Sequence, residues 1–257
     1  MTATSMTGAR AILECLRMND VEYIFGYPGG AAMPIFDALL DSPIKFILSR
    51  HEQGATHAAD GYARTTGKAG VVLVTSGPGA TNTVTAVMTA FMDSSPLVVL
   101  CGQTASPNLG LDAFQEADVS GISFPVVKHS YLVKRAVDLP HVLNEAFHLA
   151  QTGRPGPVLI DLPKDVLLAT FEPDFSAPTD LPGYAVPESG ESAAIASAAE
   201  LLTAAERPLL LVGHGVLISD ACRPVLRLAE QPQIPVANTL LGKGGFPEDH
   251  DLSLGML

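Results

Sequence analysis

Cysteine and basic residues are scarce in this sequence. The 257 residues include three cysteines, at positions 15, 101 and 222, and this odd, widely spaced set fits neither a disulfide framework nor a zinc site. We therefore expect reduced thiols and a cytoplasmic protein. Lys and Arg number 15 against 27 Asp and Glu, the formal net charge is −12, and no basic run occurs. This balance argues against a nucleic-acid partner.

Long apolar runs are also missing. No run approaches the roughly 20 residues that span a membrane, and residues 1–21 carry Arg10, Glu14, Arg17 and Asp20 among their apolar residues. Neither a membrane partner nor a signal peptide is expected. Hydrophobic residues nevertheless make up 47% and charged residues 16% of the chain, which predicts a large, well-packed core.

Short apolar runs alternate with helix-like segments over residues 1–165. The runs at 23–25, 46–48, 71–74, 97–101 and 158–162 are continuous, which is typical of strands buried on both faces of a parallel sheet. Helices are expected at 7–18, at 31–40, from 52 onward, from the turn at 75–79 to about 91, and at 140–152. A further strand should end near Val133, and residues 108–121 have no clear pattern. We predict an α/β fold, a doubly wound parallel sheet, for residues 1–165.

A stretch rich in Pro and Gly follows, and we interpret residues 166–189 as a linker. Residues 190–257 then begin a second α/β unit, with a helix at 193–205, a strand at 209–212, a turn at 213–215, a helix at 220–230 and a strand at 235–237. Two strands are too few for an independent core. We therefore expect residues 190–257 to be part of a truncated domain.

Glu52 stands out chemically, in the segment Arg-His-Glu-Gln-Gly-Ala at 50–55. It follows the predicted strand at 46–48 and opens a helix, where an acid ordinarily only complements the helix dipole. Two other turns, at 26–30 and 76–79, also follow predicted strands and are rich in Gly and Pro. Since ligands bind at the carboxyl ends of parallel strands, the three turns could line a narrow crevice with one carboxylate, suited to acid–base chemistry. The glycines could equally serve only to form the turns.

Six sequence blocks occur in order: Gly-Tyr-Pro-Gly-Gly-Ala at 26–31, Arg-His-Glu-Gln-Gly-Ala at 50–55, Gly-Tyr-Ala-Arg at 61–64, Ser-Gly-Pro-Gly-Ala-Thr-Asn at 76–82, Asp-Ala-Phe-Gln-Glu at 112–116, and Gly-Arg-Pro-Gly-Pro-Val-Leu-Ile-Asp-Leu-Pro-Lys-Asp-Val at 153–166. Together they closely resemble the large catalytic subunit of acetolactate synthase, a thiamine-diphosphate-dependent family, over essentially the whole chain. The resemblance implies that Glu52 is catalytic, because in this family a carboxylate at N1′ of the aminopyrimidine promotes loss of the thiazolium proton. Pyruvate oxidases and related decarboxylases share the glutamate block, whereas the block at 112–116 favours the synthase.

The resemblance also implies roles for other residues. Residues that would approach thiamine diphosphate or the active site are Pro78, Asn82 and Gln115; those that would contact FAD are Arg154, Gly213, Gly215, Thr239 and Leu240; those that would line the substrate channel are Gly30, Phe114 and Lys164. Plainer alternatives exist for several of them. Arg154 and Lys164 could be surface charges, Phe114 could belong to the core, and Asn82 could bond its own helical turn.

For a full-length member, the resemblance implies decarboxylation of pyruvate and condensation with a second 2-keto acid, in branched-chain amino-acid synthesis. It also implies Mg²⁺, a homodimer or tetramer, and a possible small regulatory subunit. The Gly-Asp-Gly motif that holds magnesium and the diphosphate in the family does not occur in this chain. We therefore assign no metal ligand and expect the 257 residues alone to bind no cofactor and to be inactive. Thr104-Ala105 stands where the family usually has Val-Pro, which could alter the channel.

Two alternatives stay open at this stage. The chain could be a non-catalytic truncated fragment or a dimerisation module, or it could belong to a sister thiamine-diphosphate oxidase or carboligase. The coding sequence downstream of Leu257 would test the first alternative, and product analysis with pyruvate alone would test the second. Self-association is also expected, because the strand-end turns and an alanine-rich stripe on the helix from residue 52 should be exposed; the stripe contains Ala55, Ala58, Ala59, Tyr62 and Ala63.

Overall fold

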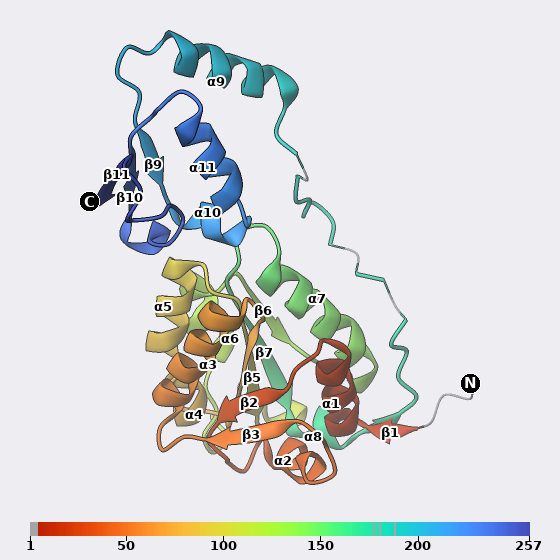
Figure 1. The fold of residues 1–257 in the computed structure, drawn as a ribbon. Coiled ribbons are helices and arrows are strands. Elements are labelled where there is room, and N and C mark those ends of the chain that lie inside the picture. The colour runs from red at the N-terminus through yellow and green to blue at the C-terminus, as the bar shows by residue number, and fades with distance from the viewer. Residues whose placement is uncertain (1–4, 177, 180, 188) are drawn as a thin grey trace. The chain divides into compact units, whose positions relative to one another are not determined.

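The computed structural model describes residues 5–176, 178–179, 181–187 and 189–257 (Figure 1). The chain divides into two compact units, Met1–Val186 and Pro187–Leu257. Each is an α/β unit in its own right, and each is described separately below.

The first unit is built on a six-stranded parallel sheet in the order β3-β2-β4-β5-β7-β6. Its strands are β2 (Tyr23–Gly26), β3 (Lys45–Leu48), β4 (Gly70–Val74), β5 (Leu97–Gln103), β6 (His129–Leu132) and β7 (Pro157–Pro163). Helices connect the strands, so the predicted α/β class and parallel sheet are confirmed. The chain runs from β2 out to β3 at one edge and then crosses back to β4, so the strand order reverses between β2 and β4. In such sheets ligands bind at the carboxyl ends of the strands, near this point of reversal.

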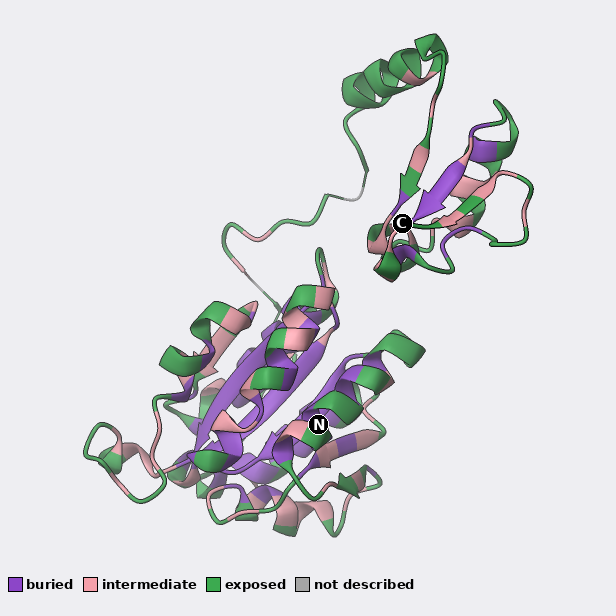
Figure 2. Cartoon of the chain, turned by 90° about the vertical axis from the view of Figure 1, so that its left-hand side faces the viewer, coloured by how far each residue is buried: buried purple, intermediate pink, exposed green. Residues whose placement is uncertain are grey.

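Helices cover both faces of this sheet (Figure 1). They are α1 (Gly8–Met18), α2 (Met33–Leu39), α3 (Glu52–Thr66), α5 (Val84–Asp93) and α7 (Leu139–Gln151). Alternate residues of each strand serve the two cores, because successive side chains point to opposite faces. Val71 and Leu73 of β4 pack with α1 and α7, whereas Val72 and Val74 pack with α3 and α5. Figure 2 shows the central strands buried between exposed outer helix surfaces.

Local signals explain where the helices of the first unit begin and end. Thr7 precedes α1, and its hydroxyl accepts a hydrogen bond from the Arg10 amide at 3.4 Å. His51 caps α3 in the same way, since its Nδ1 accepts from the Gln53 amide at 3.1 Å. The same helix stops at Gly67, whose φ of 72° is left-handed and favours glycine.

Three details of the sequence prediction are wrong. The strand at 46–48 is not buried, because β3 is an edge strand paired only with β2, and Leu48 is 61% exposed. The helix expected to reach residue 91 is two helices, α4 (Pro78–Thr81) and α5; between them the Thr83 hydroxyl bonds the Ala80 carbonyl at 2.7 Å. Most of the alanine stripe is not exposed either. Ala55, Ala59 and Ala63 are at most 2% exposed, and the last two pack against the sheet.

Short elements complete the first unit. They are β1 (Met6–Thr7), η1 (Ser106–Asn108), α6 (Val119–Ser123), η2 (Phe124–Val126), η3 (Ala136–Asp138), α8 (Lys164–Leu168) and β8 (Thr170–Phe171). The segment without a clear sequence pattern, 108–121, is thus a loop followed by the start of α6. β8 pairs antiparallel with β1, so part of the segment interpreted as linker is folded onto the first unit.

The second unit contains a three-stranded parallel sheet in the order β11-β10-β9. Its elements are α9 (Ser192–Ala204), β9 (Leu210–Val212), α10 (His214–Ile218), α11 (Cys222–Glu230), β10 (Val236–Asn238), η4 (Leu240–Gly242) and β11 (Ser253–Met256). The sequence prediction missed β11. The small core is formed by Val212, Ala229, Val236 and Phe246, and α9 contributes no buried residue to it. Across the described part of the chain, none of the helices is both long and apolar enough to span a bilayer.

Candidate active site

Three turns meet at the carboxyl ends of neighbouring strands in the first unit. They follow β2, β3 and β4, which are adjacent in the sheet. The Ala31 amide after the first turn donates to the Thr75 hydroxyl in the third turn at 3.2 Å. The Ser49 amide after β3 donates to the Gly26 carbonyl at 3.0 Å, which joins the second turn to the first. The structure therefore brings together the three turns that the sequence placed in one crevice.

Glu52 is the buried carboxylate among these three turns. It is the first residue of α3 and is 9% exposed. Its Oε2 accepts a hydrogen bond from Asn82 Nδ2 at 3.0 Å, across 30 positions of sequence. Asn82 follows α4 and directs its amide at Glu52 instead of at its own helical turn. The contact fixes the direction of the carboxylate, as expected for a group that must meet a ligand in one orientation.

Two glycines shape the turn after β4, and one of them, Gly79, lies beside the Glu52 carboxylate. A Cβ on Gly79 would stand 3.6 Å from Glu52 Oε1 and 2.8 Å from the Thr75 methyl group. Any larger residue at position 79 would therefore crowd Thr75 and partly fill the space next to Oε1. Gly77 has φ 55° and ψ −117°, a backbone conformation that side chains rarely tolerate, and it begins the turn into α4. Pro78, at the start of α4, is exposed.

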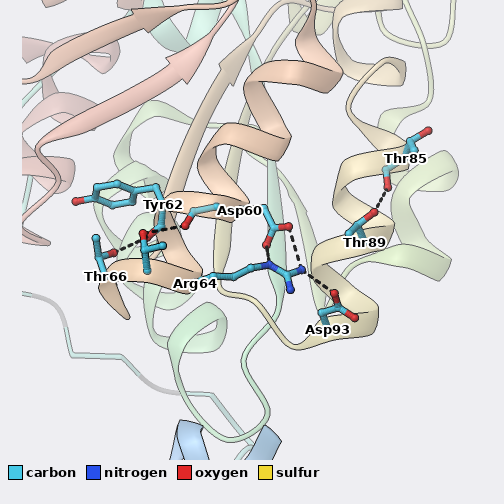
Figure 3. A network of polar contacts seen from close by, with 9 residues as sticks. Asp60, Tyr62, Arg64, Thr66, Thr85, Thr89 and Asp93 are labelled. Carbon is cyan, nitrogen blue, oxygen red and sulfur yellow. Dashed lines mark hydrogen bonds and ion pairs between the residues drawn. The ribbon is translucent and has the colours of Figure 1, made fainter. Parts of the chain in front are cut away.

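A polar network holds the helix of Glu52 against α5 (Figure 3). Arg64, near the end of α3, donates to both Asp60 carboxylate oxygens, at 2.9 and 3.0 Å. Its Nη2 also donates to Asp93 at the end of α5, at 2.8 Å. Asp60 is 5% exposed, whereas the Arg64 side chain is 32% exposed, so the ion pair is shielded from water on one side only. A bidentate, partly buried pair of this kind is stronger and more specific in geometry than an exposed one.

The loop of residues 104–118 carries two of the predicted site residues, Phe114 and Gln115. Phe114 is 88% exposed, so it is not a core residue. Gln115 has a left-handed φ of 57°, and a Cβ on Gly77 would come within 2.6 Å of its carbonyl oxygen. The loop therefore lies directly on the turn that leads to α4. The tip is ordered by Glu116, whose carboxylate accepts from the Gly110 amide and from the Ala113 amide; these backbone hydrogen bonds lower its pKa.

Two buried polar residues that the sequence analysis missed lie at the base of this loop. Asp161, in β7, is 3% exposed, and Gln103, at the end of β5, is 1% exposed. Gln103 Nε2 donates to Asp161 Oδ2 at 3.0 Å. Burial raises the pKa of Asp161 from 3.8 to about 7, and the nearby Asp118 charge adds to the rise. A lone acid inside the apolar run 158–162 is the sequence signal that could have identified this residue.

The remaining site residues of the first unit lie on its surface or in its outer turns. Gly30 is exposed, with open space around it. Lys164 begins α8, next to Asp165, whose carboxylate accepts from the Ser106 amide at the base of the 104–118 loop at 2.8 Å. Arg154 caps the end of α5, since its Nη2 donates to the carbonyls of residues 91 and 92 at 3.2 and 3.1 Å. Arg154 is therefore a surface charge that also stabilises the end of α5.

In the second unit, the predicted FAD-contacting residues gather at the carboxyl ends of β9 and β10. A Cβ on Gly213 would lie 3.9 Å from the Thr239 hydroxyl, which itself accepts from the Gly242 amide at 3.1 Å. Gly215 and Leu240 are exposed nearby in α10 and η4. Asn238 is 1% exposed, and within the described residues neither atom of its amide has a hydrogen-bond partner. Unpartnered polar atoms of this kind are unusual in a folded protein and fit a site for a polar ligand.

Metal-ligating side chains do not cluster in the part of the chain that the structure describes. No group of three or more His, Cys, Asp or Glu residues there could hold an ion. A divalent cation such as Mg²⁺ requires several oxygen ligands in near-octahedral geometry. The groups described at this position are the Glu52 carboxylate, the Asn82 amide and the backbone of the neighbouring turns.

Two family models match the sequence, one in each of the two units. Residues 6–122 match the N-terminal TPP-binding domain of thiamine pyrophosphate enzymes, and residues 195–257 match the central domain of the same enzymes. The chain belongs to the thiamine pyrophosphate enzymes, and the curated relatives that it matches are acetolactate synthases.

Individual relatives support this placement along nearly the whole chain. The probable acetolactate synthase large subunit of Methanocaldococcus jannaschii is 51% identical over 98% of this chain and 43% of its own length. The acetolactate synthase of Arthrospira platensis is 51% identical, over 98% of this chain and 45% of its own length. That of Mycobacterium bovis is 48% identical, over 98% and 41% respectively. The chain thus spans somewhat less than half the length of the curated relatives it matches.

Proposed function

We propose that this chain forms the pyrimidine-binding part of an acetolactate synthase, with Glu52 as its acid–base residue. The observation that supports the proposal most directly is the Glu52–Asn82 contact, 3.0 Å long, at the carboxyl edge of the sheet. It orients a buried carboxylate beside the space that Gly79 keeps open. The reaction proposed for the complete protein is decarboxylation of pyruvate followed by condensation with a second 2-keto acid.

The residues of this chain would contribute binding and proton transfer. Thiamine diphosphate, when bound, supplies the electron sink that decarboxylation of a 2-keto acid requires. Glu52 would hold and return a proton at N1′ of the aminopyrimidine, and Asn82 would keep the carboxylate in the direction that this transfer needs. Gln115, whose backbone lies on the Gly77 turn, would close the same crevice from the side of the 104–118 loop. Phe114, exposed on that loop, and Lys164 would meet the incoming substrate.

We also propose that the second unit contributes to an FAD site. Asn238 and His214 both present buried atoms without partners in the described residues, and Gly213 leaves the backbone accessible between them. A dinucleotide could satisfy these donors and acceptors, whose desolvation otherwise costs about 1–3 kcal/mol each. No magnesium ligand is proposed on the described residues. Mg²⁺ remains part of the proposal for the complete protein, where it would accompany the diphosphate.

Self-association is the proposed assembly, with the outer surface of α3 and α5 as the contact between two copies. This surface carries Met88 and Met92, which are 40% and 58% exposed, next to the exposed small residues Gly54, Ala58 and Gly61. Exposed apolar patches of this kind usually mark interfaces, and small residues allow close approach. A homodimer or tetramer is therefore proposed. A small regulatory subunit is proposed because several relatives are named large subunits.

We propose a cytoplasmic location as well. The support is that all three cysteines are free thiols, and two of them, Cys15 and Cys101, are buried. Burial raises the pKa of Cys15 to about 12, so its thiol stays protonated and unreactive.

The experiment that tests the function uses the complete product of the reading frame that contains this chain. The purified protein is incubated with pyruvate, thiamine diphosphate, Mg²⁺ and FAD, and the products are identified by NMR. Acetolactate supports the proposal. Acetate or acetyl phosphate without acetolactate would assign the protein to a sister oxidase instead. No turnover and no cofactor binding would favour the non-catalytic alternative.

A further inference from the structure

We propose that Gln103 and Asp161 are positioning residues, which hold the 104–118 loop in place over the active site. The proposal rests on the function proposed above, and it assigns to both residues a role in the reaction without contact to the substrate. Three sets of contacts carry it: those within the pair, those from the pair to the loop, and those from the loop to Glu52.

Gln103 joins the two ends of the loop through one side chain. Its Nε2 donates to the Ala117 carbonyl at 3.0 Å, near the end of the loop. Its Oε1 accepts from the Thr104 amide at 2.8 Å, at the beginning of the loop. A single amide therefore closes the loop at its base, and it does so at 1% exposure, where water does not compete for the hydrogen bonds.

Asp161 determines which way this amide faces. Its Oδ2 accepts from Gln103 Nε2 at 3.0 Å, so the nitrogen must point to β7 and to Ala117. A flipped amide would place its oxygen against the Ala117 carbonyl oxygen and, when Asp161 is ionised, against a carboxylate oxygen. It would also leave the Thr104 amide without an acceptor. Asp161 is therefore an orienting partner that an aliphatic residue could not replace. Its raised pKa allows a neutral carboxyl, which lowers the cost of burying it.

The loop transmits its position to Glu52 through backbone contacts. Its tip is rigid, because the Glu116 carboxylate accepts from two amides of the same loop. The Gln115 carbonyl lies against Gly77, so a movement of the loop displaces the turn that begins α4. Asn82 follows α4 and holds the Glu52 carboxylate. A loosened loop base should thus move both Gln115 and the partner of Glu52.

The test compares variants of the complete enzyme in steady-state kinetics with pyruvate. Gln103→Met keeps the length of the side chain and removes its hydrogen bonds, and Asp161→Leu removes the orienting acceptor. Asp161→Asn keeps an acceptor oxygen and is the conservative rescue. The matched control is Tyr131→Phe, which removes a hydrogen bond to Glu145 of 3.0 Å from the neighbouring strand β6 without touching the loop. Backbone hydrogen exchange of residues 104–118 is measured on every variant.

We expect kcat/KM to fall by about 10-fold to 100-fold in Gln103→Met and Asp161→Leu, the range for a modest misplacement of active-site groups. Exchange within 104–118 should accelerate in the same two variants. Asp161→Asn should recover most of both losses, and Tyr131→Phe should show neither. The proposal is overturned if the two disruptive variants match the control in kinetics and in exchange, or if Asp161→Asn is as impaired as Asp161→Leu. Using two disruptive variants guards against a folding failure of one. If the unaltered enzyme forms no acetolactate, the proposed function fails, and the exchange data alone still decide whether the pair positions the loop.

Discussion

The buried carboxyl of Asp161 should make the stability of the first unit fall as the pH rises. Its pKa is raised from 3.8 to about 7, chiefly by burial. One pKa unit corresponds to about 1.36 kcal/mol, so the interval between these values corresponds to about 4 kcal/mol. An acid with a higher pKa in the folded state binds more protons when folded. The stabilising contribution of the neutral carboxyl is therefore fully present below 3.8 and is lost as the pH rises through about 7.

The assay compares the chain with its Asp161→Asn variant, which cannot titrate at this position. Urea unfolding followed by tyrosine fluorescence reports on the first unit alone, since the sequence has no tryptophan and all its tyrosines lie in that unit: Tyr23, Tyr27, Tyr62, Tyr131 and Tyr184. Between about pH 5 and about pH 8, the unaltered chain should lose roughly 2–3 kcal/mol relative to the variant.

An exposed aspartate provides the control for this measurement. Asp37 lies on the exposed side of α2, and Asp37→Asn should differ from the unaltered chain by less than about 0.5 kcal/mol at every pH. The reasoning is refuted if the difference between the unaltered chain and Asp161→Asn stays constant over the whole pH range. It is also refuted if the unaltered chain gains stability relative to the variant as the pH rises.

Four further predictions concern chemistry, binding, assembly and the attachment of the linker. In the complete enzyme, Glu52→Gln should lower turnover by about 10²–10⁴-fold, because an amide cannot exchange the proton at N1′ of the aminopyrimidine. Glu22→Gln is the exposed control and should keep full turnover. Equal activity of the two variants would exclude Glu52 as the acid–base residue. Calorimetric titration of the 257-residue chain with thiamine diphosphate and Mg²⁺ should show no saturable micromolar binding, because no Gly-Asp-Gly motif occurs in these residues; saturable micromolar binding would contradict this prediction. Sedimentation should show self-association that Met88→Asp abolishes, and a strictly monomeric unaltered chain at high concentration would count against the interface. Lys128 donates to three acceptors, among them the Tyr184 hydroxyl at 2.9 Å, so Lys128→Met should destabilise the first unit by about 1–3 kcal/mol and speed proteolysis of the segment after β8. Lys134→Met is the exposed control, and identical cleavage rates of the two variants would contradict a role of Lys128 in attaching this segment.

Much of the fold could be predicted because its determinants are local. Continuous apolar runs such as 71–74 and 97–101 predict strands buried on both faces, and the observed strands β4 and β5 contain them. The helix after β3 begins at Glu52, as expected from the end of the apolar run at 46–48. The missed strand β11 is short and partly exposed, and it contains two exposed apolar residues, Leu254 and Met256. Its pattern therefore lacked the continuous burial that identified the others.

The candidate site was predictable only in part. Glu52 and Asn82 stand in sequence blocks that indicate a thiamine-dependent family, so the sequence made them candidates without any coordinates. Gln103 and Asp161 were not identified, because their pairing joins two strands 58 positions apart. A glutamine at the end of an apolar run does not by itself predict a role, because its hydrogen-bond partners are distant in the sequence. The exposure of β3 has a similar origin, since strand order decides which strand lies at the edge.

The sequence by itself indicated most of the elements, the family, and Glu52 as the candidate acid. Hydrophobic periodicity and turn residues act within a few positions, so they can be recognised in the sequence without coordinates. The tertiary structure alone decided that Asn82 orients Glu52, that Gln103 closes the base of the 104–118 loop, and that Ala59 and Ala63 of α3 face the sheet. These outcomes depend on which distant groups share a low-dielectric interior, where each buried polar atom must find a partner in space.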